Sequence, residues 1–552
     1  MNERHWRFFP RKLPRTLTLP KTSLWFNVEV SATRFPDRAA LVFYDGVTTY
    51  SAFKQQAQWL AGFLQRECGV RRGDRVALFM QNCPQFVIAY YAILRADAVV
   101  VPVNCMNLTQ ELGHILRDAG AKVILATQEL FARIEPLLGD AVQHAVIACY
   151  ADYISKQPQV TVPEGIAAPR VAINAPNVTL WHDALARRHS PGPHESTADD
   201  LCVIPYTSGT TGKPKGCMHR HRGVLHTTMS LAHWHDSRQD ACTLSVLPLF
   251  HVTGMQNAMN SPIYSGATLV LLPRWNKDVA ADFIQRYRVS NMTVVPAMIV
   301  DLLSMPDIAD RDLSSLRVIG GGGAAMPEAV ANRLRELCGL TYLEGYGLTE
   351  TLAPSHMNPG DRPKVQCLGI PIFDTDSRVI DPETLAELPQ GAVGEIVVHG
   401  PQVLDAYWNR PDENATCFVT LEGKRFLRTG DLGRVDEDGY FFFVERLKRM
   451  INAAGFKVWP AEIESLLYAH PDVQEACVIA SIDPRSGERV KALVVRKAAG
   501  TVAADEIIQW ARERMAAYKV PREVEFVDAL PRSATGKIDW RLLQEQENSR
   551  RP

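Results

Sequence analysis

A loop of small, hydroxyl-bearing and basic residues follows the apolar run 201–205, which predicts a β-strand. The ten residues 207–216 include four hydroxyls, three glycines and two lysines. Glycines let the backbone approach an anion, and successive N–H groups, hydroxyls and a lysine can cradle phosphate oxygens. A flexible linker would not need two lysines around a proline. We therefore interpret the loop as a phosphate site formed by Thr207, Ser208, Gly209, Thr210, Thr211, Gly212 and Lys215.

This loop is not a Walker A loop, because Lys213 is followed by Pro214 where that motif has Ser or Thr. Further motifs follow it in order: EGYGLTE at 344–350, RTGD at 428–431, RLK at 446–448 and PRSATGKI at 531–538. Each is weak alone. Together they resemble the AMP-forming adenylating superfamily of acyl-CoA synthetases, nonribosomal peptide adenylation domains and luciferases. The resemblance covers nearly the whole chain and is nearest to fatty-acyl-CoA and 4-coumarate-CoA ligases.

The resemblance implies a nucleotide site with ATP as substrate and Mg²⁺ as cofactor. Tyr346 would stack on adenine, Thr349 would hydrogen-bond the α-phosphate, and Glu350 would hold Mg²⁺ as a hard oxygen ligand, with Thr207 as the second metal ligand. Asp431 would accept hydrogen bonds from the ribose hydroxyls. The remaining nucleotide contacts implied are Gly322, Ala324, Glu344, Gly345, Gly347 and Arg446.

A second group of residues is implied to act in two successive steps. Lys537, in the motif near the end of the chain, would bridge the carboxylate and phosphate oxygens of the adenylation transition state. Lys448 would be the hinge between a large and a small domain. Gly455 and Lys457 would belong to the segment that reaches the CoA thiol arm.

The segment PLFHVTG at 248–254 carries information on the acid. Amino-acid-activating relatives place an Asp where this chain has His251, and a buried ammonium without a carboxylate partner is costly. We therefore expect a simple carboxylic acid. The glycines at 320–323 suggest room for a medium or long acyl chain or an aryl acid, although a turn chosen only for its conformation explains them nearly as well. The implied acyl-pocket residues are His251, Gly254, Met255, Gly321 and Gly322.

The resulting hypothesis is an acyl-CoA synthetase that forms an acyl-adenylate and then an acyl-CoA. A medium- or long-chain fatty acid is the favoured substrate, and a benzoate- or cinnamate-type acid is the alternative. A loader of a carrier protein also stays open, since it uses the same adenylate. No residue favours a luciferase-like oxygenase, and a non-catalytic homologue is disfavoured because none of the chemical positions holds an inert residue.

The elements that must position these residues alternate between amphipathic helices and short β-branched strands, which indicates an α/β fold with parallel sheets. Helix–strand units near 86–124 and 256–295 repeat at an offset of about 171 residues, which predicts two similar lobes. Short strands between turn signals at 377–444 predict a small antiparallel, barrel-like unit, and Pro460 predicts a helix start. We expect an AMP-binding domain at 1–446, with lobes at about 1–190 and 191–375 and a β unit at about 376–446. A mobile α+β domain would occupy 447–552.

Composition excludes several other classes. Lys plus Arg is 60 and Asp plus Glu is 61, so the net charge of −1 argues against a nucleic-acid binder. A hydrophobic content of 46% argues against disorder. Eleven scattered cysteines without C-x-x-C pairs suggest buried thiols and a cytoplasmic enzyme. No segment reads as transmembrane; peripheral membrane contact by the basic, aromatic N-terminus and a homodimer stay open.

Overall fold

The computed structural model describes residues 4–207, 214–453, 456–483, 487–497, 500–532 and 538–550, with only the backbone at 456, 457, 483 and 487. The chain divides into two compact units. The first comprises 1–377, 398–427 and 438–440, and the second comprises 378–397, 428–437 and 441–552.

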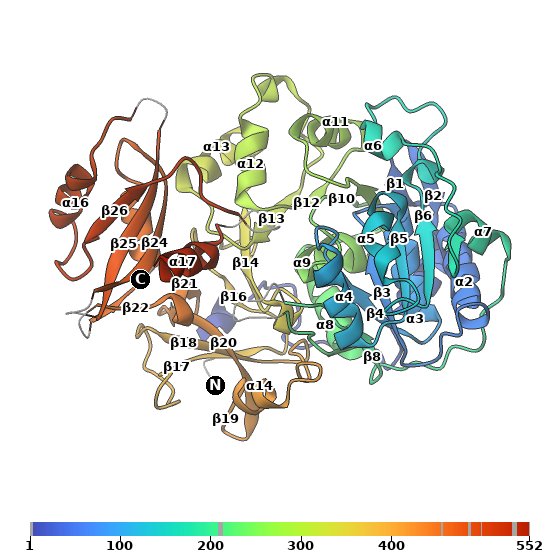
Figure 1. Cartoon of the computed structure of the whole chain (residues 1–552), viewed down its shortest axis with the longest axis horizontal. Coiled ribbons are helices and arrows are strands. Elements are labelled where there is room, and N and C mark those ends of the chain that lie inside the picture. The colour runs from blue at the N-terminus through green and yellow to red at the C-terminus, as the bar shows by residue number, and fades with distance from the viewer. Residues whose placement is uncertain are drawn as a thin grey trace. The chain divides into compact units, whose positions relative to one another are not determined.

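The first unit contains two parallel-rich sheets (Figure 1). Along the smaller sheet, the strands are β7 (Val178–Leu180), β6 (His144–Ala148), β5 (Val123–Thr127), β3 (Arg75–Phe79), β4 (Val99–Pro102), β8 (Leu201–Val203) and β9 (His219–Arg220). Along the larger sheet, they are β16 (Ile370–Pro371), β15 (His356–Met357), β14 (Leu343–Tyr346), β13 (Val318–Gly322), β12 (Asn291–Thr293), β10 (Cys242–Ser245), β11 (Thr268–Leu271), β1 (Ala39–Phe43) and β2 (Gly46–Thr49).

The two sheets follow the same plan, which confirms the predicted pair of similar lobes. The order β7-β6-β5-β3-β4-β8-β9 corresponds strand for strand to β14-β13-β12-β10-β11-β1-β2, and in both the last strand pairs antiparallel with its neighbour. The lobes also exchange strands. β1 and β2, from the start of the chain, complete the larger sheet through the parallel pair β1–β11, while β8 and β9 complete the smaller one.

The smaller sheet is buried on both faces, as expected for parallel strands. Along β3, Val76 and Leu78 enter one core cluster, while Ala77 and Phe79 enter the other. Helix α4 (Thr109–Ala119) covers the second face and ends at Gly120, whose φ of +66° suits glycine.

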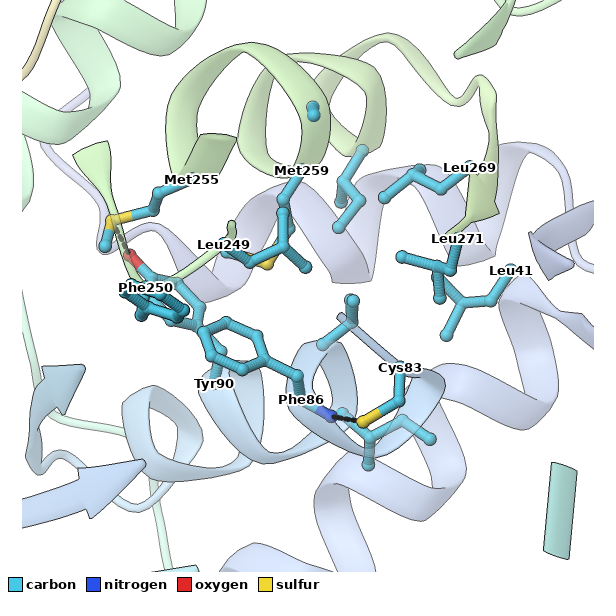
Figure 2. Close-up of a cluster of buried hydrophobic side chains, with 14 of the residues drawn as sticks. Leu41, Cys83, Phe86, Tyr90, Leu249, Phe250, Met255, Met259, Leu269 and Leu271 are labelled. Atoms are coloured by element: carbon cyan, nitrogen blue, oxygen red, sulfur yellow. Dashed lines mark hydrogen bonds between the residues drawn. The ribbon is translucent and has the colours of Figure 1, made fainter. Parts of the chain in front are cut away.

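Helix α3 (Pro84–Arg95) joins the two lobes in one core. Figure 2 shows its Phe86 and Tyr90 beside Phe250 and Met255 of the second lobe, with the Tyr90 hydroxyl donating to Met255 Sδ at 3.6 Å. The helix begins at Pro84. Proline has no N–H, and this costs nothing here because an N–H in the first turn has no partner within the helix. Cys83 Sγ accepts a hydrogen bond from Phe86 N. The two lobes therefore share apolar packing and form one unit.

The other helices of this unit connect and cover the strands. They are α1 (Trp25–Arg34), α2 (Tyr50–Arg66), α5 (Phe131–Ile134), α6 (Glu164–Ala167), α7 (Trp181–Ala186), α8 (His221–Trp234), α9 (Val252–Met255), α10 (Ser261–Ser265), α11 (Lys277–Tyr287), α12 (Pro296–Leu303), α13 (Glu328–Cys338) and α14 (Pro411–Thr416). A π-helical turn, η5 (Gln256–Asn260), joins α9 to α10, and a 3-10 turn, η7 (Thr349–Thr351), follows β14.

The predicted antiparallel unit at 377–444 is confirmed as a five-stranded sheet. Its strands are β17 (Asp376–Ile380), β18 (Gly394–His399), β19 (Phe418–Leu421), β20 (Lys424–Val435) and β21 (Phe441–Arg446). β20 pairs antiparallel with both β19 and β21.

The C-terminal part of the second unit is an α+β fold, as predicted. Its sheet has the order β23 (Phe456–Val458), β22 (Ile451–Ala453), β25 (Gly487–Arg496), β24 (Val473–Asp483), with β26 (Glu523–Phe526) parallel to β25. Its helices are α15 (Pro460–Leu467), α16 (Ala504–Arg512) and α17 (Trp540–Ser549), and Pro460 opens α15 as expected. Among the described residues, none of the helices has the length and apolarity to cross a membrane.

Candidate active site

The two ends of the predicted phosphate loop are fixed to each other by backbone pairing. Tyr206 and Gly216 form an antiparallel bridge. Thr207 N donates to Lys215 O at 2.9 Å, and Lys215 N donates to Thr207 Oγ1 at 3.2 Å. The base of the loop therefore holds Thr207 and Lys215 together. The predicted contacts Ser208, Gly209, Thr210, Thr211 and Gly212 lie outside the described residues.

The base of the loop also meets the acidic residue of the 344–350 motif through Tyr407. The Tyr407 hydroxyl donates to Glu350 Oε1 at 2.8 Å, and Lys215 Nζ lies 4.6 Å from the centre of the Tyr407 ring. Burial and the Glu350 charge raise the pKa of Tyr407, so the phenol stays protonated and donates. The structure thus gathers Thr207, Lys215 and Glu350 at one place, and their roles toward nucleotide and metal stay predictions.

The 344–350 motif begins on β14 and turns into η7. Its first residue, Glu344, is buried, and its carboxylate accepts Met326 N at 2.8 Å and Cys367 N at 3.2 Å. Burial raises the pKa of Glu344, and these backbone donors partly offset that effect. The Glu344 carboxylate therefore orders the loop before α13 and the segment at Cys367. Its predicted nucleotide contact stays a prediction.

The other members of the motif are half-buried at the end of the same strand. Gly345 and Tyr346 pair with Met357 and His356 on β15, and the Tyr346 and His356 rings lie 5.5 Å apart. Gly347 approaches Ala353 so closely that a Cβ on Gly347 would lie 2.7 Å from the Cα of Ala353. The main-chain oxygen of Thr349 accepts a hydrogen bond from His219 Nε2 at 2.9 Å, which fixes the turn before Glu350.

The buried His219 that makes this bond is neutral, because desolvation lowers its pKa to about 4. Within the described part of the chain, no cluster of His, Cys, Asp and Glu could hold a metal ion by itself.

The glycine run has a packing cause. A Cβ on Gly321 would lie 2.0 Å from Val294 O, and one on Gly322 would lie 2.3 Å from Gly345 O. β13 lies between β12 and β14 and runs parallel to both, so the glycines allow its backbone to lie close to the chain on either side. Gly323 has a φ of +89°, which favours glycine, and the exposed Ala324 follows it. The pocket interpretation of Gly321 and Gly322 stays a prediction.

The other three residues predicted to line the acyl pocket lie at or next to α9. His251 precedes the helix, and its ring lies 4.8 Å from that of Phe250. A Cβ on Gly254 would lie 2.3 Å from Pro248 O, so the helix packs directly on the preceding loop. Met255 is fully buried beside Phe250 and Tyr90 (Figure 2). His251 is therefore half-buried at the start of the helix, while Met255 belongs to the shared core.

In the second unit, the predicted ribose residue Asp431 is paired with Arg446. Asp431 is opposite Arg446 in the β20–β21 pair, and Arg446 Nε lies 3.0 Å from Asp431 Oδ1. Glu395 anchors the motif, because it accepts Gly430 N at 3.0 Å and binds Arg428 Nη2 at 2.7 Å. The sequence predicted both residues for the nucleotide but not this ion pair between them.

The predicted hinge Lys448 is exposed within a 3-10 turn at 447–449. Carboxylates hold the chain on both sides of it, and of the two only Glu445 is fully buried. Glu445 accepts Ala461 N at 2.6 Å, and Arg449 contacts Glu464. Burial raises the pKa of Glu445, and Arg449 opposes that shift. Gly455, the Lys457 side chain and Lys537 lie outside the described residues, so their roles stay predictions.

Sequence reasoning missed Tyr407 and Asp118. The Asp118 carboxylate accepts from the Tyr206 hydroxyl at 2.7 Å and pairs with Arg410 at 3.0 Å, while its carbonyl accepts Trp408 Nε1 at 2.9 Å. Asp118 therefore ties Tyr206, the residue before the loop, to the segment that carries Tyr407. A lone Asp at the end of a helix and a Tyr beyond the motifs give no sequence signal for these contacts.

Comparison with known proteins shows the family of the chain. The AMP-binding enzyme model matches residues 28–408, and the AMP-binding enzyme C-terminal domain model matches residues 462–537. The chain is 35% identical to a long-chain-fatty-acid–CoA ligase of Bacillus subtilis, over 98% of this chain and 97% of that one. It is 34% identical to a feruloyl-CoA synthase of Amycolatopsis, over 92% of this chain and 96% of that one.

Solved structures agree with these sequence matches. The crystal structure of ATP-bound MatB from Rhodopseudomonas palustris superposes with a TM-score of 0.84 at 28% identity, covering 95% of this chain and 99% of that one. A fatty acyl CoA synthetase of Mycobacterium tuberculosis superposes with a TM-score of 0.74 at 29% identity, covering 96% and 99%. The family models match most of the chain. The chain belongs to the AMP-binding enzyme family.

Proposed function

We propose that this protein is an AMP-forming acid–CoA ligase that activates a medium- or long-chain fatty acid. The acid's carboxylate attacks the α-phosphorus of ATP and forms an acyl-adenylate and pyrophosphate. The CoA thiolate then attacks the acyl carbon and releases AMP. The observation that carries the proposal is the cluster of Lys215, Tyr407 and Glu350 at the base of the loop, in a chain whose full-length relatives include CoA ligases.

The residues of this cluster fit a magnesium nucleotide. Glu350 offers a hard carboxylate ligand, and the Thr207 hydroxyl lies at the loop base that also holds Lys215. A bound Mg²⁺ would neutralise phosphate charge during attack at the α-phosphorus. Lys215 would bind a phosphate oxygen, Thr349 the α-phosphate, and Tyr346 the adenine face. Asp431 and Arg446 would bind the ribose.

The fatty-acid assignment is supported by the relative from Bacillus subtilis, which is a long-chain-fatty-acid–CoA ligase, and by the similar structure from Mycobacterium tuberculosis, which is a fatty acyl CoA synthetase. An aryl acid is the second candidate, because a feruloyl-CoA synthase matches at similar identity. In either case, His251 in place of an acidic residue disfavours an amino acid. His251, Gly254, Met255, Gly321 and Gly322 would line the acid's pocket.

The two steps are assigned to two placements of the C-terminal domain. Lys537 would serve adenylation, and rotation about Lys448 would then replace it with the segment of Gly455 and Lys457 for thioester formation. The domains are proposed as 1–446 and 447–552, and the location as cytoplasmic. The cysteines of the described residues form no disulfide, which fits a reducing compartment.

The test of the activity is pyrophosphate release measured over a panel of fatty, cinnamate-type and amino acids, with and without CoA. We expect release with fatty acids of medium or long chain, and formation of acyl-CoA and AMP when CoA is present. If pyrophosphate is released but no acyl-CoA forms, and a phosphopantetheinyl carrier protein is acylated, the protein is a carrier-loading enzyme. Release only with amino acids would overturn the proposal.

The two-step assignment is tested with Lys537→Ala. Loss of one preorganised charge stabiliser should lower adenylation by about 10²–10³-fold. Turnover of synthetic acyl-AMP with CoA should largely persist, because that step does not use Lys537. Equal loss of both steps would contradict the assignment.

A further inference from the structure

Tyr407 contacts two charged residues of the site. Its hydroxyl donates to Glu350 Oε1 at 2.8 Å, and Lys215 Nζ lies 4.6 Å from the centre of its ring. The ammonium therefore faces the π-system, which attracts cations, while the carboxylate meets the hydroxyl. One aromatic side chain thus holds both charges.

The backbone around Tyr407 is fixed on both sides. Tyr407 forms a bridge with Cys217, its N–H donates to Asn414 Oδ1 at 2.7 Å, and its carbonyl accepts Asn414 Nδ2 at 2.9 Å. Leu404 N also donates to Glu350 O at 2.8 Å, so the segment before Tyr407 is tied to the backbone of Glu350. Only 7% of the surface of Tyr407 is exposed, so its ring is held in place by the surrounding residues.

The arrangement separates opposite charges that would otherwise attract each other. A lysine and a glutamate within reach of each other gain Coulomb energy by pairing, and a paired Lys215 and Glu350 would be less available to a ligand. Among the ion pairs of the described residues, none joins Lys215 to Glu350; both charges are directed onto Tyr407.

We propose that Tyr407 is a positioning residue whose ring keeps Lys215 and Glu350 apart, so that the ammonium serves the triphosphate and the carboxylate serves its magnesium ion. The inference rests on the proposed function, because it assigns these two ligands to the two charges. It adds a residue outside the motifs, and it assigns separate effects to the hydroxyl and to the ring.

These two parts of the side chain are tested by Tyr407→Phe and Tyr407→Leu. Binding of a non-hydrolysable ATP analogue is measured by calorimetry with and without MgCl2. Tyr407→Phe removes only the bond to Glu350, so the Mg²⁺ half-saturation should rise about tenfold while Mg²⁺-free binding stays unchanged. Tyr407→Leu removes the ring and lets Lys215 pair with Glu350. Analogue affinity should then fall about tenfold or more under both conditions.

Tyr440 provides a matched control. Its ring has Lys364 Nζ 4.6 Å from its centre, and its hydroxyl donates to the backbone oxygen of Arg362 at 2.7 Å. It therefore has the same lysine–tyrosine contact, but its hydroxyl donates to a backbone oxygen where that of Tyr407 donates to Glu350. Tyr440→Phe should leave both binding constants unchanged.

A double variant separates positioning from general loosening of the fold. In a Glu350→Gln background, Tyr407→Phe should change the Mg²⁺ concentration at half-saturation by less than about twofold, because the carboxylate that Tyr407 positions is gone. Full additivity, unchanged Mg²⁺ dependence in Tyr407→Phe, or equal losses with and without Mg²⁺ would each overturn the inference.

If Tyr407→Phe does not fold, as judged by its thermal melt, Lys215→Met gives an independent reading. Mg²⁺-free affinity should fall, while the Mg²⁺ half-saturation stays within about twofold. Equal changes in both quantities would contradict the separation of roles. A wild-type protein that binds the analogue but forms no acyl-CoA with any acid would instead reject the proposed function alone.

Discussion

Two polar clusters in the first unit have the residue types of an active site, but they differ in burial. In one, Ser23 Oγ lies 2.6 Å from His194 Nε2, and His194 Nδ1 lies 2.8 Å from Asp97 Oδ1. This is the order of contacts in a serine hydrolase triad. In the other, Lys215 and Glu350 are linked through Tyr407 at the loop base.

The difference shows that contact geometry alone does not identify a catalytic site. Ser23 is fully buried, so a substrate cannot reach its hydroxyl. The Asp97 carboxylate also accepts Ser196 N at 2.8 Å and Glu195 N at 3.1 Å. The cluster therefore holds the segments at Ser23 and 194–196 against the α3–β4 turn. Glu350, by contrast, is half-buried and is linked through Tyr407 to the base of the loop, so its carboxylate keeps some exposure to solvent.

The largest expected effect is that of Glu350→Gln. It removes the charge that would hold Mg²⁺ against the phosphates, so adenylation should fall by about 10²–10³-fold. Pyrophosphate release at saturating acid measures this loss. The thermal melt should move little, since the amide can still accept from Tyr407. A loss of less than about threefold would remove Glu350 from the reaction.

Lys215→Met should have a smaller effect on activity. The methionine can still pack on the Tyr407 ring, but the phosphate loses a charge-assisted contact, worth about 1.5–3 kcal/mol. We expect kcat/KM for ATP to fall by about tenfold or more, with KM carrying most of the change. The KM of the acid serves as the internal control and should stay constant.

The contrast also shows what a sequence can predict. The loop at 207–216 and the motif at 344–350 were found because glycines, hydroxyls and charges are adjacent in the chain. Tyr407 was not found from the sequence, because 57 residues separate it from Glu350 in the chain. The strand exchange has the same cause, since β1 pairs with β11 across more than two hundred residues. The helix–strand echo predicted two lobes, but no local pattern tells which strand completes which sheet.

Asp97→Asn should affect stability and leave catalysis unchanged. Burial alone would raise the pKa of Asp97, but hydrogen bonds from His194 and Ser196 and the nearby imidazole hold it at about 2. Losing this acceptor should cost about 1–3 kcal/mol in the free energy of unfolding, measured by urea denaturation. kcat/KM of the folded variant should equal that of the wild type.

The pH dependence of that difference has a definite sign. The folded pKa of Asp97 lies below its ordinary value of 3.8, so its charge adds stability above about pH 4, and this contribution is lost as the pH falls toward about 2. The stability gap between wild type and Asp97→Asn should therefore be widest near neutral pH and narrow below pH 4. A gap that widens on acidification would contradict the assigned role.

Ser23→Ala should have the smallest effect, and it tests the comparison directly. The variant removes one buried hydroxyl and leaves His194 Nε2 without that partner, which should cost about 1 kcal/mol in unfolding free energy. Acyl-CoA formation should be unchanged, and the wild-type protein should not react with a fluorophosphonate, because the hydroxyl is inaccessible in the folded state. Labelling of Ser23 in the native protein would show that the buried cluster opens and would make it a nucleophilic site after all. If neither labelling nor loss of activity is seen, the burial of the hydroxyl overrides its triad-like contacts.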